Sequence, residues 1–129
     1  MKYMLTMQGR AKDWESMGSW KPEEFRAHIQ FMLELNAELS AAGELLQAEG
    51  LDVPANARVV KATKSDAPIV SDGPFAETKE FLAGFWIVQV PSLARATAIA
   101  AKASTAPGPG GTPMAIPIEV RQVMSVPDM

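Results

Sequence analysis

Hydrophobic and polar positions alternate at the start of the chain. In residues 2–7, KYMLTM, the side chains of Tyr3, Leu5 and Met7 fall on one side of an extended backbone. This period of two predicts a first strand. Residues 8–21 carry glycine, charges and tryptophan without a clean period, and we expect a loop there.

The period then changes to that of a helix. From Pro22, apolar side chains recur in steps of three and four, and the run ends at Gly43. Proline suits the first helical turn because its missing N–H needs no partner there. Glu23 and Glu24 lie where the helix dipole favours negative charge. We therefore expect a long helix over residues 22–42.

Short apolar runs separated by turn residues follow. Residues 44–51 are consistent with a short strand, and residues 58–63 and 67–71 with the two strands of a hairpin. The strongest strand pattern is FLAGFWIVQV at 81–90, because aromatic and β-branched residues dominate it and Pro91 ends it. We expect this strand to be central in the sheet.

The remainder of the chain predicts one more helix and one more strand. Ser92 can cap the helix. Residues 104–115 form a Pro/Gly-rich loop without the Gly-Lys-Ser/Thr ending of a phosphate-binding loop. Residues 116–124 alternate and predict the last strand. The expected inner face of the helix comprises Leu93, Ala96, Ile99, Ala100 and Ala103.

This order of elements predicts one α+β domain over residues 1–129, a ferredoxin-like βαββαβ fold with an inserted hairpin. We expect an antiparallel sheet with both helices on one face. The central strand has Phe85 and Ile87 on one side, and Trp86 and Val88 on the other. The uncovered face would expose a large apolar patch in a monomer. Two copies paired sheet to sheet would bury it, which predicts a homodimer.

Composition narrows the classes of function. The 129 residues contain no cysteine, which excludes zinc–thiolate sites, iron–sulfur clusters and thiol nucleophiles, and suits a cytoplasmic location. The net charge is -3 and the basic residues are scattered, which argues against nucleic-acid binding. The apolar stretch at the N-terminus is too short for a signal peptide or a membrane span. No ligand spacing predicts a metal or another cofactor.

The turn Asp72-Gly73-Pro74-Phe75 leads through further charged residues into the strongest strand. An aspartate here can accept hydrogen bonds from backbone amides, glycine permits unusual dihedral angles, proline fixes the next one, and phenylalanine can anchor the loop. Such a turn fits the border of a pocket, and it fits a purely architectural role equally well.

His28 is the only histidine, and it falls on the apolar stripe of the predicted long helix between Phe25 and Met32. If its partner were Asp72, the carboxylate would hold the ring's tautomer and raise its basicity, which would create a general base. The alternative is a packing residue with a satisfied ring.

Charged residues near the turn and on the last strand form the remaining candidate set. Carboxylates beside a guanidinium can orient a small polar ligand, although solvated ion pairs are the alternative. The set comprises Glu77, Lys79, Glu80, Glu119 and Arg121. The two on the last strand point away from its apolar side, toward the face that we expect to be covered.

Five stretches together resemble the YCII-related, DGPF-domain proteins over nearly the whole chain: KYMLTM, the PEE helix start, AEGL at 48–51, SDGPFAETKEFLAGFWIV at 71–88 and IEVRQV at 118–123. The resemblance implies a dimeric α+β barrel of ferredoxin-like halves. The wider superfamily includes muconolactone-isomerase-like and dehydrochlorinase-like enzymes of small cyclic compounds, for which a His/Asp pair has been suggested as the active site. Asp72 matches the motif aspartate. The chain departs from the family at Gln122, where proline is frequent.

These observations lead to two hypotheses. In the first, a pocket between sheet, long helix and the 72–80 loop binds a small polar or aromatic molecule, and isomerises it or eliminates a group from it. Asp72 and His28 would be the acid–base pair. In the second, the domain is a non-catalytic binding or interaction module, and Asp72 only builds its turn. The residues expected to contact the ligand are Glu49, Phe75, Glu77, Glu119 and Arg121.

Overall fold

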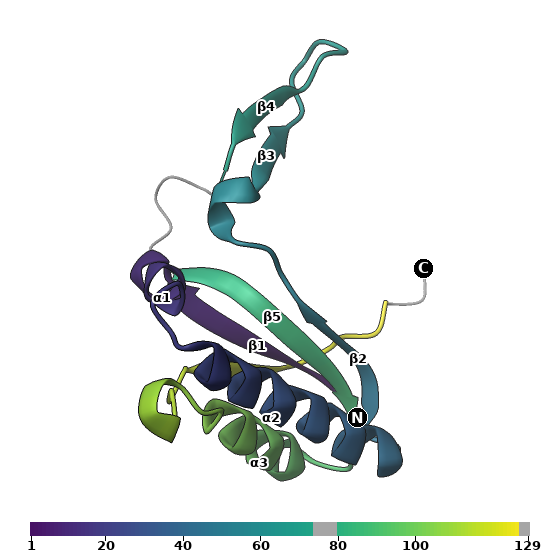
Figure 1. The fold of residues 1–129 in the computed structure, drawn as a ribbon. Coiled ribbons are helices and arrows are strands. Elements are labelled where there is room, and N and C mark those ends of the chain that lie inside the picture. Colours follow the sequence, from purple (N-terminus) through teal and green to yellow (C-terminus); the bar gives the residue numbers. More distant parts are fainter. Residues whose placement is uncertain (74–79, 127–129) are drawn as a thin grey trace.

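The computed structural model describes residues 1–73 and 80–126, and its elements follow the predicted order with one addition (Figure 1). The addition is a short helix directly after the first strand. The elements are β1 (Lys2–Arg10), α1 (Ala11–Met17), α2 (Pro22–Ala41), β2 (Leu45–Gly50), the 3-10 turn η1 (Pro54–Asn56), β3 (Arg58–Lys61), β4 (Ile69–Asp72), β5 (Glu80–Gln89), α3 (Leu93–Ser104), the 3-10 turn η2 (Pro109–Gly111) and β6 (Ile118–Gln122).

Four strands form an antiparallel sheet in the order β2-β5-β1-β6, and β3 pairs with β4 in a separate hairpin. Helices α2 and α3 lie on the same side of the four-stranded sheet (Figure 1). The predicted α+β, ferredoxin-like fold with an inserted hairpin is thereby confirmed. The strand with the strongest pattern, β5, lies inside the sheet as predicted, between β2 and β1.

The core lies between the helices and the sheet. Leu5 and Val88 from the two inner strands are fully buried, and Leu35 from α2 and Ile99 from α3 close over them. Each such side chain contributes about 1.5–3 kcal/mol by leaving water. The indole Nε1 of Trp86 donates a 2.8 Å hydrogen bond to Asn36 Oδ1, which satisfies the one polar atom of that buried ring.

Helix α3 packs closely because its buried face is built largely from alanine. Its cap is as predicted, since the Ser92 hydroxyl accepts a hydrogen bond from Arg95 N. The prediction for Leu93 was wrong, because this side chain is exposed. At 100° per residue it lies roughly 70° from the centre of the buried stripe, in the first turn of the helix.

The loop predicted over residues 8–21 was also wrong, because β1 continues to Arg10 and residues 11–17 form α1. A β-bulge between Met7 and Gln8 shifts the register with β5. The bulge breaks the alternation of side chains, so the residues after Met7 do not show the period of two that predicts a strand. Helix α1 starts where Asp13 Oδ2 accepts a hydrogen bond from the Arg10 amide.

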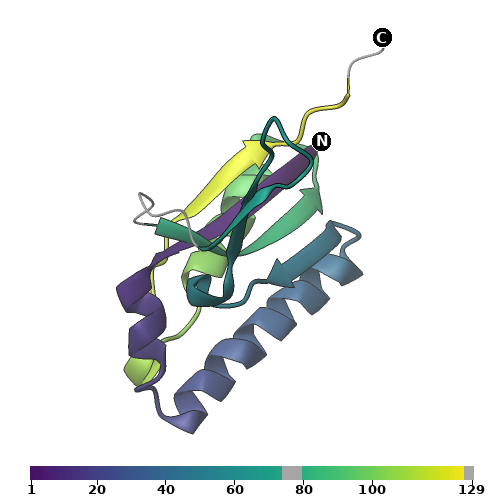
Figure 2. The same ribbon diagram turned by 90° about the horizontal axis from the view of Figure 1, so that it is seen from above.

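The sheet face opposite α2 and α3 carries Met4, Phe85 and Ile87, all partly buried, and no helix of the described residues covers it (Figure 2). Residues Glu119 and Arg121 of β6 lie on the same face, opposite Thr6 and Met4 of β1. Their alternation with the inward Ile118 and Val120 is as predicted. The homodimer expected from this face involves a second chain and stays a prediction.

Candidate functional site

A groove of about 590 Å³ opens between the N-terminal half of α2, the sheet and the segment that follows β2. We call it the α2 groove. Most of the side chains that line it are apolar, and none of the lining residues in the described part of the chain is lysine or arginine. Its main apolar residues are Met7, Met17, Phe25, Ile29, Met32, Leu33, Leu51, Val53, Phe85, Trp86, Met114 and Ile116. Its polar residues are Gln8, Asp13, His28, Asn36, Glu49 and Asp52.

The groove exists because only part of the apolar stripe on α2 reaches the core. From Leu35 onward the stripe is buried against the sheet. In the first half of the helix Phe25 and Ile29 belong to the same stripe, yet their side chains are exposed and line the groove. A stripe of helical period thus serves two purposes: its second half packs the core, and its first half forms a wall.

The floor of the groove depends on a close approach of two strands at Gly84 of β5, which pairs with Gly50 of β2. A Cβ atom at Gly84 would lie 2.7 Å from the backbone oxygen of Glu49. Real Cβ atoms do not approach a backbone atom this closely, so β2 can pack here only against glycine. This approach positions Glu49 at the edge of the groove.

His28 supplies a polar group in the apolar wall. The residue is only 8% exposed, and its Nδ1 lies 3.1 Å from the carbonyl oxygen of Pro107. Because a carbonyl oxygen can only accept, this hydrogen bond requires a proton on Nδ1. In the neutral ring Nε2 then carries the lone pair, and within the described residues no hydrogen bond reaches it. The edge of the ring contacts Trp20, with centroids 5.7 Å apart and planes at 77°.

The rim of the groove is acidic. Asp52 accepts hydrogen bonds from the Asn56 side chain and from the Val53 amide, and these hold the pKa of its carboxyl below the usual value. It therefore stays ionised at neutral pH. Asp13 and Glu49 are two further acidic residues of the lining, and Glu49 pairs with Phe85, so its side chain lies on the sheet face turned away from the helices.

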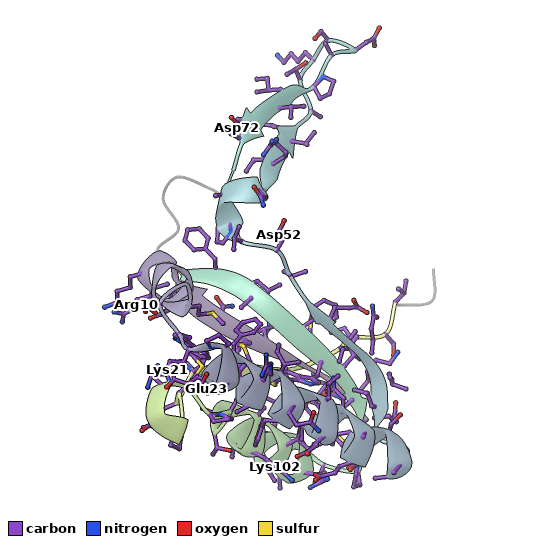
Figure 3. All side chains as sticks on the ribbon, viewed as in Figure 1. Arg10, Lys21, Glu23, Asp52, Asp72 and Lys102 are labelled. Atoms are coloured by element: carbon purple, nitrogen blue, oxygen red, sulfur yellow. The ribbon has the colours of Figure 1, made fainter. Side chains whose placement is uncertain are left out.

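The structure separates the two residues predicted as an acid–base pair. His28 lines the α2 groove, whereas Asp72 lies at the end of β4 on the hairpin, well away from α2 (Figure 3). The Asp72 side chain is 90% exposed, and its carboxylate lies 3.4 Å from Arg58 Nε across the hairpin. Within one chain, therefore, His28 and Asp72 do not meet, and their joint role stays a prediction.

The other predicted site residues are also dispersed. Glu49 lines the groove. Glu119 and Arg121 form a loose, exposed ion pair of 3.7 Å on the uncovered sheet face, outside the groove. Phe75 and Glu77 lie outside the described residues, as does Lys79. Glu80 is exposed at the start of β5 and is absent from the groove lining.

Sequence reasoning missed the apolar wall of the groove. Its residues were visible as the first part of the apolar stripe on α2, but periodicity does not show which part of a stripe is buried in the core. It also missed Leu51 and Val53, which line the groove from an irregular segment with no period.

The described residues contain no group of three His, Cys, Asp or Glu side chains that could hold a metal ion. None of the helices in residues 1–73 and 80–126 combines the length and apolar character that crossing a membrane would need.

Comparisons with known proteins agree with the fold. Residues 1–111 match the family described as YCII-related domain. The chain is also 34% identical over 88 residues to the uncharacterised protein R00369 of Rhizobium meliloti (strain 1021), in a match that covers 68% of this chain and 70% of that protein.

Proposed function

The chain belongs to the YCII-related family, and from the geometry of the α2 groove we propose that it binds there a small, largely apolar molecule with one polar group. An aromatic ring bearing a hydroxyl or an N–H group matches the groove best. The observation that carries this proposal is the position of His28, a buried hydrogen-bonding ring that lines the groove next to apolar side chains of α2.

The size and lining of the groove support this class of ligand. Its volume of about 590 Å³ is within the range of small-molecule sites in proteins. Apolar walls stabilise a bound ring by roughly 25 cal/mol for each Å² removed from water. The acidic rim disfavours anionic ligands, because Asp13, Glu49 and Asp52 would repel them and no cation in the described lining offsets the repulsion.

His28 can fix the orientation of such a ligand. With Nδ1 donating to Pro107, the lone pair of Nε2 can accept a hydrogen bond from a ligand O–H or N–H. The same geometry supports acid–base chemistry, because a proton taken up at Nε2 leaves an imidazolium that still donates to Pro107. Isomerisation or elimination by His28 is therefore the catalytic form of the proposal, and simple binding is the non-catalytic form.

Participation of Asp72 in that chemistry would require a second chain or a movement of the hairpin, because the two residues lie apart in one chain. We further propose the homodimer, since it would cover the sheet face that carries Met4, Phe85 and Ile87. Roles for Phe75, Glu77, Glu119 and Arg121 in ligand binding stay predictions, as does a cytoplasmic location.

A thermal-shift screen with small phenols and indoles, paired with ring analogues that lack the O–H or N–H, tests the proposal. Ligands of the folded state raise the unfolding temperature. Ile29→Trp would fill the groove and abolish the shift. His28→Asn retains a donor near Nδ1 and removes the Nε2 acceptor, so a phenol should bind about tenfold more weakly, which corresponds to about 1.4 kcal/mol.

The matched control is Glu38→Gln, a carboxylate removed from the second half of α2, outside the groove. It should leave the shift unchanged if the ligand occupies the groove. Shifts that persist at full size in both Ile29→Trp and His28→Asn would refute the proposal. In the same screen, Asp72→Ala shows whether the aspartate of the motif contributes to binding.

A further inference from the structure

The β3–β4 hairpin is an arm whose strands, within the described residues, pair only with each other. Its two strands pair with each other from Arg58↔Asp72 to Lys61↔Ile69, and a hydrogen bond of 2.8 Å from Gly73 N to Ala57 O closes its base. Figure 1 shows it projecting from the body, clear of the sheet and of the helices. An isolated two-stranded hairpin is marginally stable at best in water.

The arm exposes apolar side chains on both faces. The cross-strand pair Val60 and Val70 is 64% and 59% exposed, and Ile69 on the other face is 57% exposed. Neighbouring apolar side chains on a projecting two-stranded ribbon favour a partner surface that would cover them.

The α2 groove presents a complementary surface. Phe25, Ile29 and Leu33 on one wall, with Leu51 and Val53 on the other, are large apolar residues that remain exposed. Both surfaces therefore expose apolar side chains to water, and contact between them would bury these side chains.

Their charges are also complementary. The lining of the groove carries Asp13, Glu49 and Asp52 and, among the described residues, no lysine or arginine. The arm carries Arg58, Lys61 and Lys64 against Asp66 and Asp72, a net charge of +1. Asp72 lies 3.4 Å from Arg58 at the base, and Lys61 and Lys64 lie toward the tip. Opposite charges across an interface select the partner and speed the encounter.

The connection between groove and arm disfavours contact within one chain. Leu51 and Val53 line the groove, and the chain then turns outward through η1 into β3. Asp52 holds this elbow by accepting hydrogen bonds from the Val53 amide at 2.7 Å and from the Asn56 side chain at 2.9 Å. Folding the arm back onto its own groove would break these contacts.

We propose that each chain of a homodimer lays its β3–β4 arm over the open side of the α2 groove of the other chain. The inference rests on the proposed homodimer. The seven residues from Arg58 to Lys64 extend roughly 23 Å at 3.3 Å per residue. Stacked sheets lie about 10 Å apart, so the arm is long enough to reach past the sheet of the second chain. The groove gains a wall from the second copy and becomes an enclosed cavity only in the dimer.

Disulfide trapping tests this exchange without background, because the chain has no cysteine of its own. In Val60→Cys/Leu33→Cys, arm and groove each carry one thiol. Mild oxidation should give a covalent dimer on a non-reducing gel at least tenfold faster than in the control Val60→Cys/Ala101→Cys, whose second thiol lies on an exposed position of α3. Disulfides need Cα atoms within about 7 Å, so the rate reports proximity.

The other outcomes overturn the inference. A fast-migrating monomer with an internal disulfide would show that the arm closes its own groove. A dimer yield no faster than the control would show that the arm and the groove do not meet. The pair Ile69→Cys/Leu33→Cys repeats the measurement from the opposite face of the arm. It covers the case in which the thiol at position 60 points away from the groove of the other chain.

Charge reversal supplies an independent readout. Lys61→Glu and Glu49→Lys should each weaken the dimer about tenfold in sedimentation equilibrium at low salt, and the double variant should recover most of the loss. Failure of both trapping and recovery rejects the arm exchange but leaves ligand binding in the groove open. Loss of ligand binding with intact trapping rejects the proposed function alone.

Discussion

Replacing Gly84 by alanine tests the most tightly constrained contact beneath the α2 groove. The added Cβ would meet the backbone oxygen of Glu49 at 2.7 Å and the Cα of Gly50 at 3.3 Å. The oxygen would have to retreat by roughly 0.7 Å to restore an ordinary van der Waals separation. Both contacting atoms belong to the backbone of β2, so no side-chain rotation relieves the clash.

The expected cost follows from this geometry. Overpacking that forces backbone shifts costs about 1–3 kcal/mol. For a chain of 129 residues each kcal/mol lowers the unfolding temperature by about 4 °C, which gives a loss of about 4–12 °C. Because the displaced strand also carries Glu49, ligands of the groove should bind more weakly to Gly84→Ala as well.

The chain offers a matched control directly across the ladder. Gly50 pairs with Gly84, yet a Cβ atom at Gly50 would meet nothing within 4 Å. Gly50→Ala should therefore leave stability unchanged or raise it by up to about 1 kcal/mol, because alanine restricts the unfolded chain.

Urea unfolding followed by tryptophan fluorescence measures both variants, at one protein concentration because association would add to apparent stability. The reasoning would be refuted if Gly84→Ala unfolded within 0.5 kcal/mol of the native protein. It would also be refuted if Gly50→Ala lost as much stability as Gly84→Ala, since the effect would then have no connection with the close approach.

Three further predictions concern local contacts. Ser92→Ala removes the cap of α3 and should cost about 1 kcal/mol in urea unfolding, with Ser92→Gly losing less. Asn36→Ala leaves the buried indole N–H of Trp86 without its acceptor and should cost about 1–3 kcal/mol, with a shift in tryptophan emission. The Arg95 guanidinium holds the pKa of Glu44 below its ordinary 4.5, so the stabilisation from this pair, no more than about 1 kcal/mol, should be present above that pH and disappear as pH falls through the folded value. A flat difference between native protein and Glu44→Gln across an acid titration would contradict it.

Several features of the fold were predictable because their signals are local. The period of α2, the cap at Ser92 and the aromatic, β-branched run of β5 each depend on residues close in sequence. The order of these elements then leaves few ways to build a sheet with two helices on one face. The sequence also singled out His28 and Glu49, both of which line the groove.

Tertiary structure alone decided the rest, because those features depend on distances between segments far apart in the chain. The bulge after Met7 follows from pairing with β5, and the tautomer of His28 follows from Pro107, which lies 79 residues away. The separation of Asp72 from His28 has the same origin: the hairpin that carries Asp72 projects from the body, while the groove forms where α2 leaves the sheet. Periodicity shows which side of an element is apolar, but only packing decides whether that side is buried in the core or exposed in a groove.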